Sequence, residues 1–311
     1  MNLKFIAEAG VNHNGKLSIA KKLVRAAAVA GADYIKFQAF NADSLVKKGT
    51  KKAKYQMQNT KKNEDQYKML KKLQLNTKDF KILNKECKKN KINFLLSIFD
   101  VESIKIIKEL NLKVFKIPSG EITNYFLLSK LAKYKFKVIL STGMATLKEI
   151  KEAIKVLTSS VISKKDITIL QCTTDYPSKF TDVNLRAMNT LRKNFRTSVG
   201  LSDHTLGKLN PLMAAMMGAN LIEKHFTLNK NNRGPDHKAS LDPKELTELI
   251  QDLKNIPIIL GSSKKKPTKN ETIIKTLVRK SIVAKKEIRK GEKFSLNNLS
   301  AKRPGTGISP M

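Results

Sequence analysis

Eight short runs rich in apolar and β-branched residues recur along the first 255 residues, and longer stretches with helical periodicity lie between them. In one of these stretches Leu23, Val24 and Ala27 share one helical face, while Lys21 and Lys22 occupy the other. The predicted strands are 3–7, 34–38, 93–97, 114–117, 137–141, 168–172, 198–201 and 220–224, and the clearest helical stretches are 17–28, 79–90, 101–110, 146–158 and 243–253. Eight strand–helix units predict an α/β fold, a (β/α)₈ TIM barrel, with an open doubly wound sheet as the alternative.

The composition changes after the last unit. Residues 259–277 hold small and charged residues and Pro267, which is typical of a linker. We therefore expect a barrel domain over 1–258, a linker over 259–277 and a small C-terminal segment over 278–311. The last of these is too short to build a core of its own and is expected to dock on another surface.

The formal net charge of +35 raises nucleic-acid binding as an alternative function. Only 8 of the 61 basic residues are Arg, the chain has no Trp, and the lysines are spread along the whole sequence. Because sequence readers of nucleic acids rely on Arg and on stacking aromatics, this pattern favours a solvated lysine surface and no nucleic-acid partner.

No signal peptide and no apolar run of about 20 residues is evident, so we expect a cytoplasmic protein without a membrane span. Cys87 and Cys172 follow no metal-binding or redox spacing and are expected to be reduced, small apolar residues.

Polar and ionisable residues close each of the predicted strands. In a TIM barrel the carboxyl ends of the strands meet at one mouth, where the active site lies. Lys36 and Lys116 close the second and fourth strands and, with the hydroxyls of Ser97, Ser119, Ser141 and Ser202, suit a compact anion such as a phosphate ester.

His204 and His225 end adjacent strands and could share a divalent metal. With oxygen ligands from Glu8, Asp236 or water, Mn²⁺ or Mg²⁺ is expected rather than a closed zinc site. His13 and His237 lie in loops and receive no role.

The blocks at the strand ends resemble, in the same order, motifs of the sialic acid synthase family. They are IAEAGVNHNG (6–15), IKFQ (35–38), FKIPSGE (115–121), LSTGM (140–144), GLSDHT (200–205), IEKHFT (222–227) and GPDH (234–237). The segment 278–311 resembles the beginning of the family's antifreeze-like (SAF) domain.

The resemblance implies a synthase that condenses phosphoenolpyruvate with N-acetylmannosamine and water to give N-acetylneuraminate and phosphate. The alternative is a legionaminate synthase that uses a 6-deoxy-2,4-diacetamido-mannose. By resemblance Glu8, His204 and His225 are catalytic, the two histidines hold the metal, and the remaining site residues divide between the two substrates. For phosphoenolpyruvate they are Lys36, Ser97, Lys116, Ser119, Ser141, Thr174 and Ser202; for the sugar they are Gln38, Glu121, Tyr176, Glu223, Asp236 and Arg303.

The resemblance also implies a domain-swapped homodimer, in which the antifreeze-like domain of one subunit covers the barrel of its partner and supplies Arg303. Three positions depart from the family pattern: Ile98 replaces a proline after Ser97, Gln171 a histidine, and Thr174 an asparagine. The antifreeze-like domain is expected to be truncated after the loop of Arg303, so a catalytically impaired relative is a further alternative.

Overall fold

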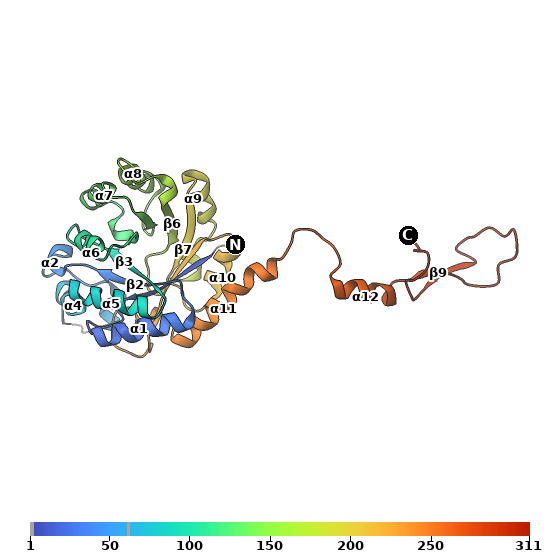
Figure 1. Ribbon diagram of the computed structural model, residues 1–311, viewed down its shortest axis with the longest axis horizontal. Coiled ribbons are helices and arrows are strands. Elements are labelled where there is room, and N and C mark those ends of the chain that lie inside the picture. Colours follow the sequence, from blue (N-terminus) through green and yellow to red (C-terminus); the bar gives the residue numbers. More distant parts are fainter. Residues whose placement is uncertain (1–2, 61–62) are drawn as a thin grey trace. The chain divides into compact units, whose positions relative to one another are not determined.

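The computed structural model describes residues 3–60 and 63–311, and the chain divides into two compact units, Met1–Ile259 and Leu260–Met311 (Figure 1). The first unit is a closed barrel of eight parallel strands, in which β1 pairs with both β2 and β8. The strands are β1 (Lys4–Gly10), β2 (Tyr34–Ala39), β3 (Asn93–Ile98), β4 (Val114–Ile117), β5 (Lys137–Ser141), β6 (Ile167–Cys172), β7 (Ser198–Asp203) and β8 (Leu221–His225). The predicted TIM barrel is confirmed, and the open sheet is wrong.

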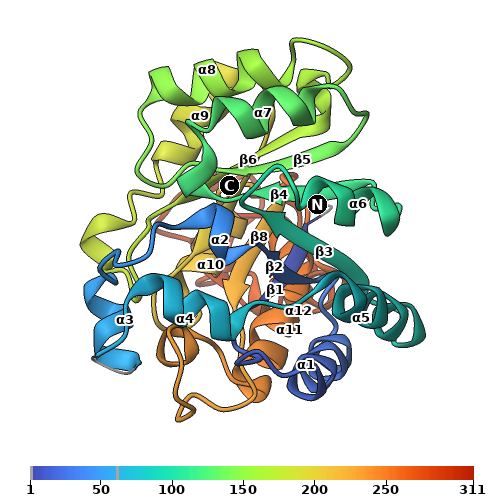
Figure 2. The same cartoon turned by 90° about the vertical axis from the view of Figure 1, so that its left-hand side faces the viewer.

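A ring of helices encloses the strands (Figure 2). The helices that return the chain from one strand to the next, and the last helix of the barrel, are α1 (Leu17–Ala30), α5 (Thr77–Lys89), α6 (Ile104–Glu109), α7 (Tyr125–Ala132), α8 (Leu147–Leu157), α9 (Ala187–Phe195), α10 (Leu209–Met216) and α11 (Pro243–Leu260). Local sequence starts some of them: the Thr146 hydroxyl accepts from the Glu149 N–H at the start of α8, and the Glu149 carboxylate accepts from the Thr146 N–H. Short 3₁₀ turns lie at Ser119–Glu121, Lys164–Asp166, Phe180–Asp182 and His237–Ala239.

The inside of the barrel changes from apolar to polar within two residues along five of its strands, β1, β3, β5, β6 and β8. A buried apolar cluster of Ile6, Leu95, Ile139, Leu170 and Leu221 fills the lower part. Two positions further along the same strands stand Glu8, Ser97, Ser141, Cys172 and Glu223. Because side chains alternate between the two faces of a strand, these residues point to the same interior as the apolar cluster. The barrel therefore carries a polar ring directly on an apolar plug.

The segment between β2 and α5 contains three helices that periodicity did not predict. They are α2 (Ala42–Leu45), α3 (Lys54–Asn59) and α4 (Gln66–Leu73). All three are short. Asp65 caps the start of α4, because its carboxylate accepts from the Lys68 N–H. The Asn59 amide donates to the carbonyl of Pro235, which ties α3 to the loop after β8. We call residues 40–75 the β2–α5 excursion.

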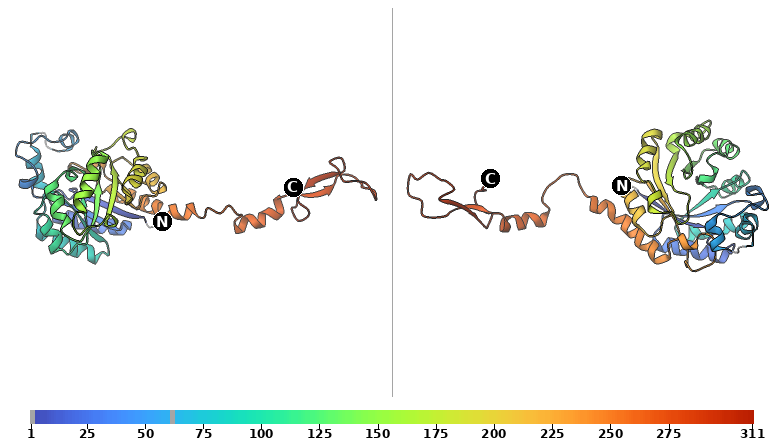
Figure 3. Two further views of the ribbon diagram at one scale, coloured as in Figure 1. Left: turned by 90° about the horizontal axis from the view of Figure 1, so that it is seen from above. Right: turned by 180° about the vertical axis from the view of Figure 1, so that it is seen from behind.

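The second unit contains helix α12 (Lys269–Val278) and the antiparallel pair β9 (Ser281–Ala284) and β10 (Leu299–Lys302) (Figure 3). Helix α12 falls within the expected linker, where Thr268 and Glu271 form a capping box. Ile273, Ile274 and Leu277 on this helix are exposed within the unit. Among the helices in the described ranges, none has the length and apolar character required to cross a bilayer.

A substitution at Gly200 of β7 would measure how tightly the barrel is packed. A Cβ at this position would overlap the carbonyl oxygen of Leu221 and crowd the side chain of Leu170. We expect Gly200→Ala to lower the free energy of unfolding by about 1–3 kcal/mol, measured by urea denaturation, because the strands must move apart.

Gly120→Ala is the matched control, since a Cβ there would meet no atom within 4 Å. It should change the free energy of unfolding by less than about 0.5 kcal/mol. Equal effects of the two substitutions would contradict the packing argument.

Candidate active site

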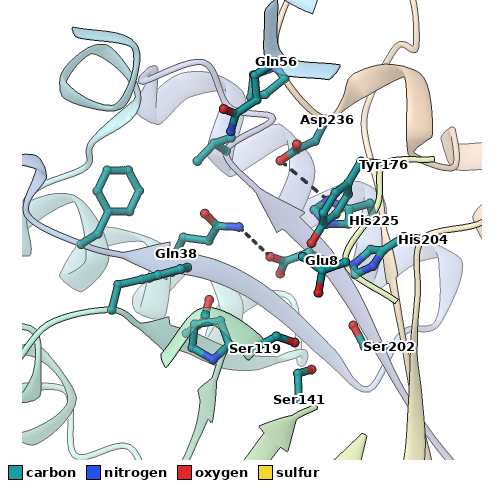
Figure 4. A pocket seen from close by; sticks show the side chains of 18 of the residues that line it. Glu8, Gln38, Gln56, Ser119, Ser141, Tyr176, Ser202, His204, His225 and Asp236 are labelled. Atoms are coloured by element: carbon teal, nitrogen blue, oxygen red, sulfur yellow. Dashed lines mark hydrogen bonds and ion pairs between the residues drawn. The ribbon is translucent and has the colours of Figure 1, made fainter. Parts of the chain in front are cut away.

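A cavity of about 350 Å³ opens at the carboxyl ends of the barrel strands (Figure 4). Most of the residues predicted from the sequence line it together. They are Glu8, Lys36, Gln38, Ser97, Lys116, Ser119, Ser141, Thr174, Tyr176, Ser202, His204, Glu223, His225 and Asp236. Glu8, Ser202 and His225 lie within strands rather than after them, because β1, β7 and β8 extend further toward the mouth than their patterns predicted.

Four buried charges form a chain across the floor of this cavity. The Lys36 ammonium lies 2.8 Å from Glu8 Oε2 and 3.8 Å from Glu223 Oε2, and the Lys116 ammonium lies 2.6 Å from Glu223 Oε1. We call Glu8, Lys36, Glu223 and Lys116 the charge ladder. Their side chains are at most 5% exposed, so each charge depends on its neighbours for compensation.

The pKa values within the ladder follow from burial and pairing. Burial raises the pKa of Glu223, but the positive charges of Lys116 and Lys36 outweigh it and hold the pKa at about 2. Burial raises the pKa of Glu8 above its ordinary value, and Lys36 offsets this only in part. Burial also lowers the pKa of Lys116, which Glu223 only partly restores. Glu223 is therefore the firm anion of the ladder, while Glu8 is the carboxyl that takes a proton more readily.

Hydroxyl groups surround the ladder. Ser202 donates to Glu223 Oε1 at 3.0 Å, and the Ser119 hydroxyl accepts from the Gly143 N–H at 2.9 Å. Within the described part of the chain, the buried hydroxyl of Ser141 has no hydrogen-bond partner. A Cβ on Gly143 would overlap the hydroxyl of Thr174 and crowd that of Ser119, so a larger residue here would displace both hydroxyls. Hydroxyls beside two buried ammonium groups are suited to binding a multiply charged anion.

The two imidazoles predicted to share a metal lie side by side, with ring centroids 5.4 Å apart. His204 Nδ1 lies 2.7 Å from the carbonyl oxygen of Thr173, so we assign its proton to Nδ1, which leaves Nε2 as an acceptor. Buried His225 has a pKa well below its ordinary value because of burial and the neighbouring charges of His204 and Lys36. Its Nδ1 has no hydrogen-bond partner among the described residues and lies 4.0 Å from Asp236 Oδ2.

These features fit a metal site of two imidazoles, in which a backbone carbonyl fixes the ring orientation of His204. Burial lowers the pKa of His204, but Cys172 and the Thr173 carbonyl raise it above its ordinary value, so this imidazole must give up its second proton before it can bind an ion. The oxygen ligands expected from Glu8, Asp236 or water stay a prediction. Among residues 3–60 and 63–311, no three His, Cys, Asp or Glu side chains converge closely enough to hold an ion. The carboxylate of Glu8 instead pairs with Lys36 and accepts from the Gln38 amide at 3.2 Å.

A second buried ion pair lies behind the imidazoles. Lys224 pairs with Asp203, and the ammonium also donates to the Thr205 carbonyl at 2.6 Å. The same carboxylate accepts from the Asn210 amide at 2.6 Å. Since Asp203 precedes His204 and Lys224 precedes His225, this pair ties together the two strand ends that carry the imidazoles.

Glu121 and Arg303 are not among the residues that line the cavity. Glu121 is absent from its lining because its carboxylate accepts from Asn124 at 2.7 Å, within its own turn. Arg303 belongs to the second unit, where its side chain is exposed and donates to the Val278 carbonyl at 2.9 Å.

Several lining residues escaped the sequence analysis. The Cys172 thiol lies 3.9 Å from His204 Nδ1 and 3.7 Å from the Ser119 hydroxyl. Burial alone would raise the pKa of this thiol, but His204 and Lys116 lower it to about 7. Its position at the end of the sixth predicted strand was a signal that could have placed it in the ring. Tyr55, whose ring stacks on Tyr176 with centroids 5.1 Å apart, comes from the β2–α5 excursion and has no such signal.

Comparisons with known proteins bear on both units. The sequence model of the NeuB family matches residues 23–265, and that of the SAF domain matches residues 279–311. The chain is 52% identical over 306 residues to the N,N'-diacetyllegionaminic acid synthase of Campylobacter jejuni, covering 98% of this chain and 92% of that protein. It is 46% identical over 312 residues to the synthase of the same name from Legionella pneumophila, covering 100% and 88%. The crystal structure of an N-acetylneuraminic acid synthetase from Leptospira borgpetersenii, in complex with citrate, matches with a TM-score of 0.76 and 33% identity, covering 88% of this chain and 90% of that one.

The charge ladder generates a stability prediction. Lys116→Met removes the closest partner of Glu223 and leaves that carboxylate buried with Lys36 at 3.8 Å. We expect the free energy of unfolding to fall by about 3–5 kcal/mol, measured by urea denaturation.

The matched control is Lys113→Met, the same substitution at an exposed position just before β4. It should cost less than about 0.5 kcal/mol. A Lys116→Met protein as stable as the control would show that Glu223 does not depend on Lys116.

Proposed function

The chain belongs to the NeuB family, and on this premise we propose that it condenses phosphoenolpyruvate with a 6-deoxy-2,4-diacetamido-mannose to give N,N'-diacetyllegionaminic acid and phosphate. It is a phosphoenolpyruvate-dependent, C–C bond-forming synthase of the sialic acid synthase type. The choice of sugar is carried by one observation: identities of 52% and 46% to two legionaminic acid synthases, over nearly the whole chain, against 33% to a sialic acid synthetase. These identities favour the legionaminate alternative over N-acetylmannosamine, which the sequence motifs had favoured. Membership of an enzyme family also sets aside the nucleic-acid-binding alternative.

The charge ladder and its hydroxyls supply the phosphoenolpyruvate subsite. The ammonium groups of Lys36 and Lys116 are paired with carboxylates, which hold them in place on the cavity floor. We assign the phosphate and carboxylate of phosphoenolpyruvate to Lys36, Ser97, Lys116, Ser119, Ser141, Thr174 and Ser202. The unpartnered hydroxyl of Ser141 is a donor that such an anion would satisfy. Ammonium groups fixed in advance lose little conformational freedom on binding.

His204 and His225 are the residues that would hold a divalent ion, Mn²⁺ or Mg²⁺, with the remaining ligands supplied by water and substrate. Such an ion would contribute Lewis acidity toward the aldehyde oxygen of the open-chain sugar. The Thr173 carbonyl, which fixes the His204 ring, keeps one imidazole nitrogen directed for this task.

The reaction forms one bond between the substrates and breaks one in phosphoenolpyruvate. Carbon 3 of phosphoenolpyruvate attacks the aldehyde carbon, and the aldehyde oxygen takes up a proton. Water adds at carbon 2 and loses a proton, and the C–O bond to phosphate breaks as the new hydroxyl becomes the ketone. Glu8 is our candidate for the proton transfer at the water, because its raised pKa and its place beside Lys36 allow it to accept and return a proton.

The sugar lies, in this proposal, on the side of the cavity formed by Gln38, Tyr176 and Asp236. Burial, together with the charge of Glu8, raises the pKa of Asp236 to about 7, so this carboxyl can donate as well as accept hydrogen bonds near neutral pH. We further propose that the protein is a homodimer in which Arg303, from the second unit of the partner subunit, reaches the sugar. The family resemblance of the SAF segment implies this arrangement.

Phosphate release with three sugars tests the proposed function. With phosphoenolpyruvate and Mn²⁺ present, we expect a 6-deoxy-2,4-diacetamido-mannose to give the highest kcat/KM and N-acetylmannosamine a lower one. Glucose, which lacks the acetamido groups, should give none. A higher kcat/KM with N-acetylmannosamine would overturn the choice of sugar, and no release with any of them would overturn the reaction.

Removal of the metal tests the imidazole pair. Dialysis against a chelator should abolish phosphate release, and added Mn²⁺ should restore it. His204→Ala and His225→Ala should each weaken Mn²⁺ binding, measured by calorimetry without substrate. The loss should exceed the roughly 10–100-fold that is typical when a residue hydrogen-bonded to a metal ligand is replaced.

His237→Asn is the control, because this imidazole contacts Thr227 and Asn14 rather than the cavity. If either alanine variant binds Mn²⁺ as tightly as this control does, the two imidazoles are not the metal site.

A further inference from the structure

One side of the cavity is apolar, and the chemistry of the reaction makes no use of it. We call this side the apolar wall and define it as Val11, Phe40, Leu45, Met69, Leu73 and Phe99. Val11, Phe40, Met69 and Leu73 form a hydrophobic cluster separate from both the barrel plug and the main core, with Leu45 and Phe99 packed against it.

The wall is a built surface, held by packing. Phe40 and Phe99 meet edge to face with ring centroids 6.1 Å apart. Met69 and Leu73 are one helical turn apart on α4 and are both buried. Most of the wall comes from the β2–α5 excursion, which the Asn59–Pro235 hydrogen bond fastens to the loop carrying Asp236. Its position is therefore set by contacts at the mouth.

Apolar side chains cannot replace the hydrogen bonds that a sugar hydroxyl makes with water. A hydroxyl pressed against the wall loses those partners, whereas a methyl group gains by leaving water. The polar side of the cavity, with the charge ladder and imidazoles, is occupied in our proposal by phosphoenolpyruvate and the aldehyde end of the sugar. The far end of the sugar then lies against the remaining lining, which includes the wall.

We propose that the apolar wall receives the C6 methyl group of the sugar and that Met69, Leu73 and Leu45 thereby select 6-deoxy substrates over their 6-hydroxy counterparts. This inference rests on the proposed function and adds the part of the chain that sets its specificity. The 6-deoxy-2,4-diacetamido-mannose carries three methyl groups, on C6 and on the two acetyl groups, whereas N-acetylmannosamine carries one. A wall made of apolar side chains suits the sugar with more methyl groups, the 6-deoxy-2,4-diacetamido-mannose.

The expected selectivity is moderate. A hydrophobic pocket discriminates against an analogue that only adds a hydroxyl by up to about 100-fold, because a small shift or a water molecule can accommodate the extra group. We therefore expect the wild-type chain to favour the 6-deoxy sugar over the same diacetamido sugar with a 6-hydroxyl by about 10- to 100-fold in kcat/KM.

The test compares these two sugars, which differ only at C6, in four proteins: wild type, Met69→Gln, Leu45→Gln and Met57→Gln. Glutamine has nearly the length of methionine and offers an amide partner to a hydroxyl. In Met69→Gln we expect the ratio of kcat/KM values to fall by about 10-fold or more. Leu45 is half-buried, so Leu45→Gln repeats the test at a position that tolerates a polar group more readily.

Met57→Gln is the matched control, because Met57 lies on α3 of the same excursion and is exposed outside the cavity lining. It should leave the ratio at the wild-type value. The KM for phosphoenolpyruvate should stay the same in all four proteins, which separates a change in selectivity from partial unfolding.

Each outcome decides one question. A ratio that falls in Met69→Gln and Leu45→Gln but not in Met57→Gln supports the wall. A wild-type enzyme that turns over both sugars, with a ratio unchanged in both wall variants, overturns the wall and leaves the proposed function intact. A wild-type chain that releases no phosphate with either sugar overturns the proposed function, and the wall with it.

Discussion

Burial of four alternating charges at the mouth of the barrel is the constraint on which the rest of the site depends. Glu8, Lys36, Glu223 and Lys116 come from four different strands and are all nearly inaccessible to water. Each charge is stabilised by its neighbours, since an unpaired buried charge is strongly unfavourable. The apolar plug lies directly beneath the ladder, so interactions between these buried charges are only weakly screened.

The ladder also fixes the groups to which we assign the anion. The carboxylates of Glu8 and Glu223 hold the two ammonium groups in place. When an anion with a phosphate and a carboxylate arrives, it can share the same ammonium groups without a rearrangement of the strands. The imidazoles lie at the ends of β7 and β8, where the Asp203–Lys224 pair connects the two strand ends. The groups to which we assign the chemistry thus lie in or next to strands.

The apolar wall has a different structural origin, in the β2–α5 excursion and the ends of β1 and β3. The excursion contains none of the four ladder residues, and contacts such as the Asn59–Pro235 hydrogen bond attach it to the mouth. A division of this kind, with chemistry on the strands and selectivity on a connecting segment, is a general property of barrel enzymes.

The amino-acid sequence by itself determined the barrel and most of its mouth. Strand–helix alternation predicts the fold, and a closed parallel barrel must gather its strand ends, so Lys36, Lys116, His204 and His225 could be grouped without coordinates. Only the tertiary structure decided which charges pair. It placed Glu223 between two lysines, turned Glu121 toward Asn124, brought Cys172 beside His204, and folded the excursion into a wall. Periodicity reports which face of a strand a residue occupies, whereas pairing distances and the course of a long connection depend on packing between segments far apart in the chain.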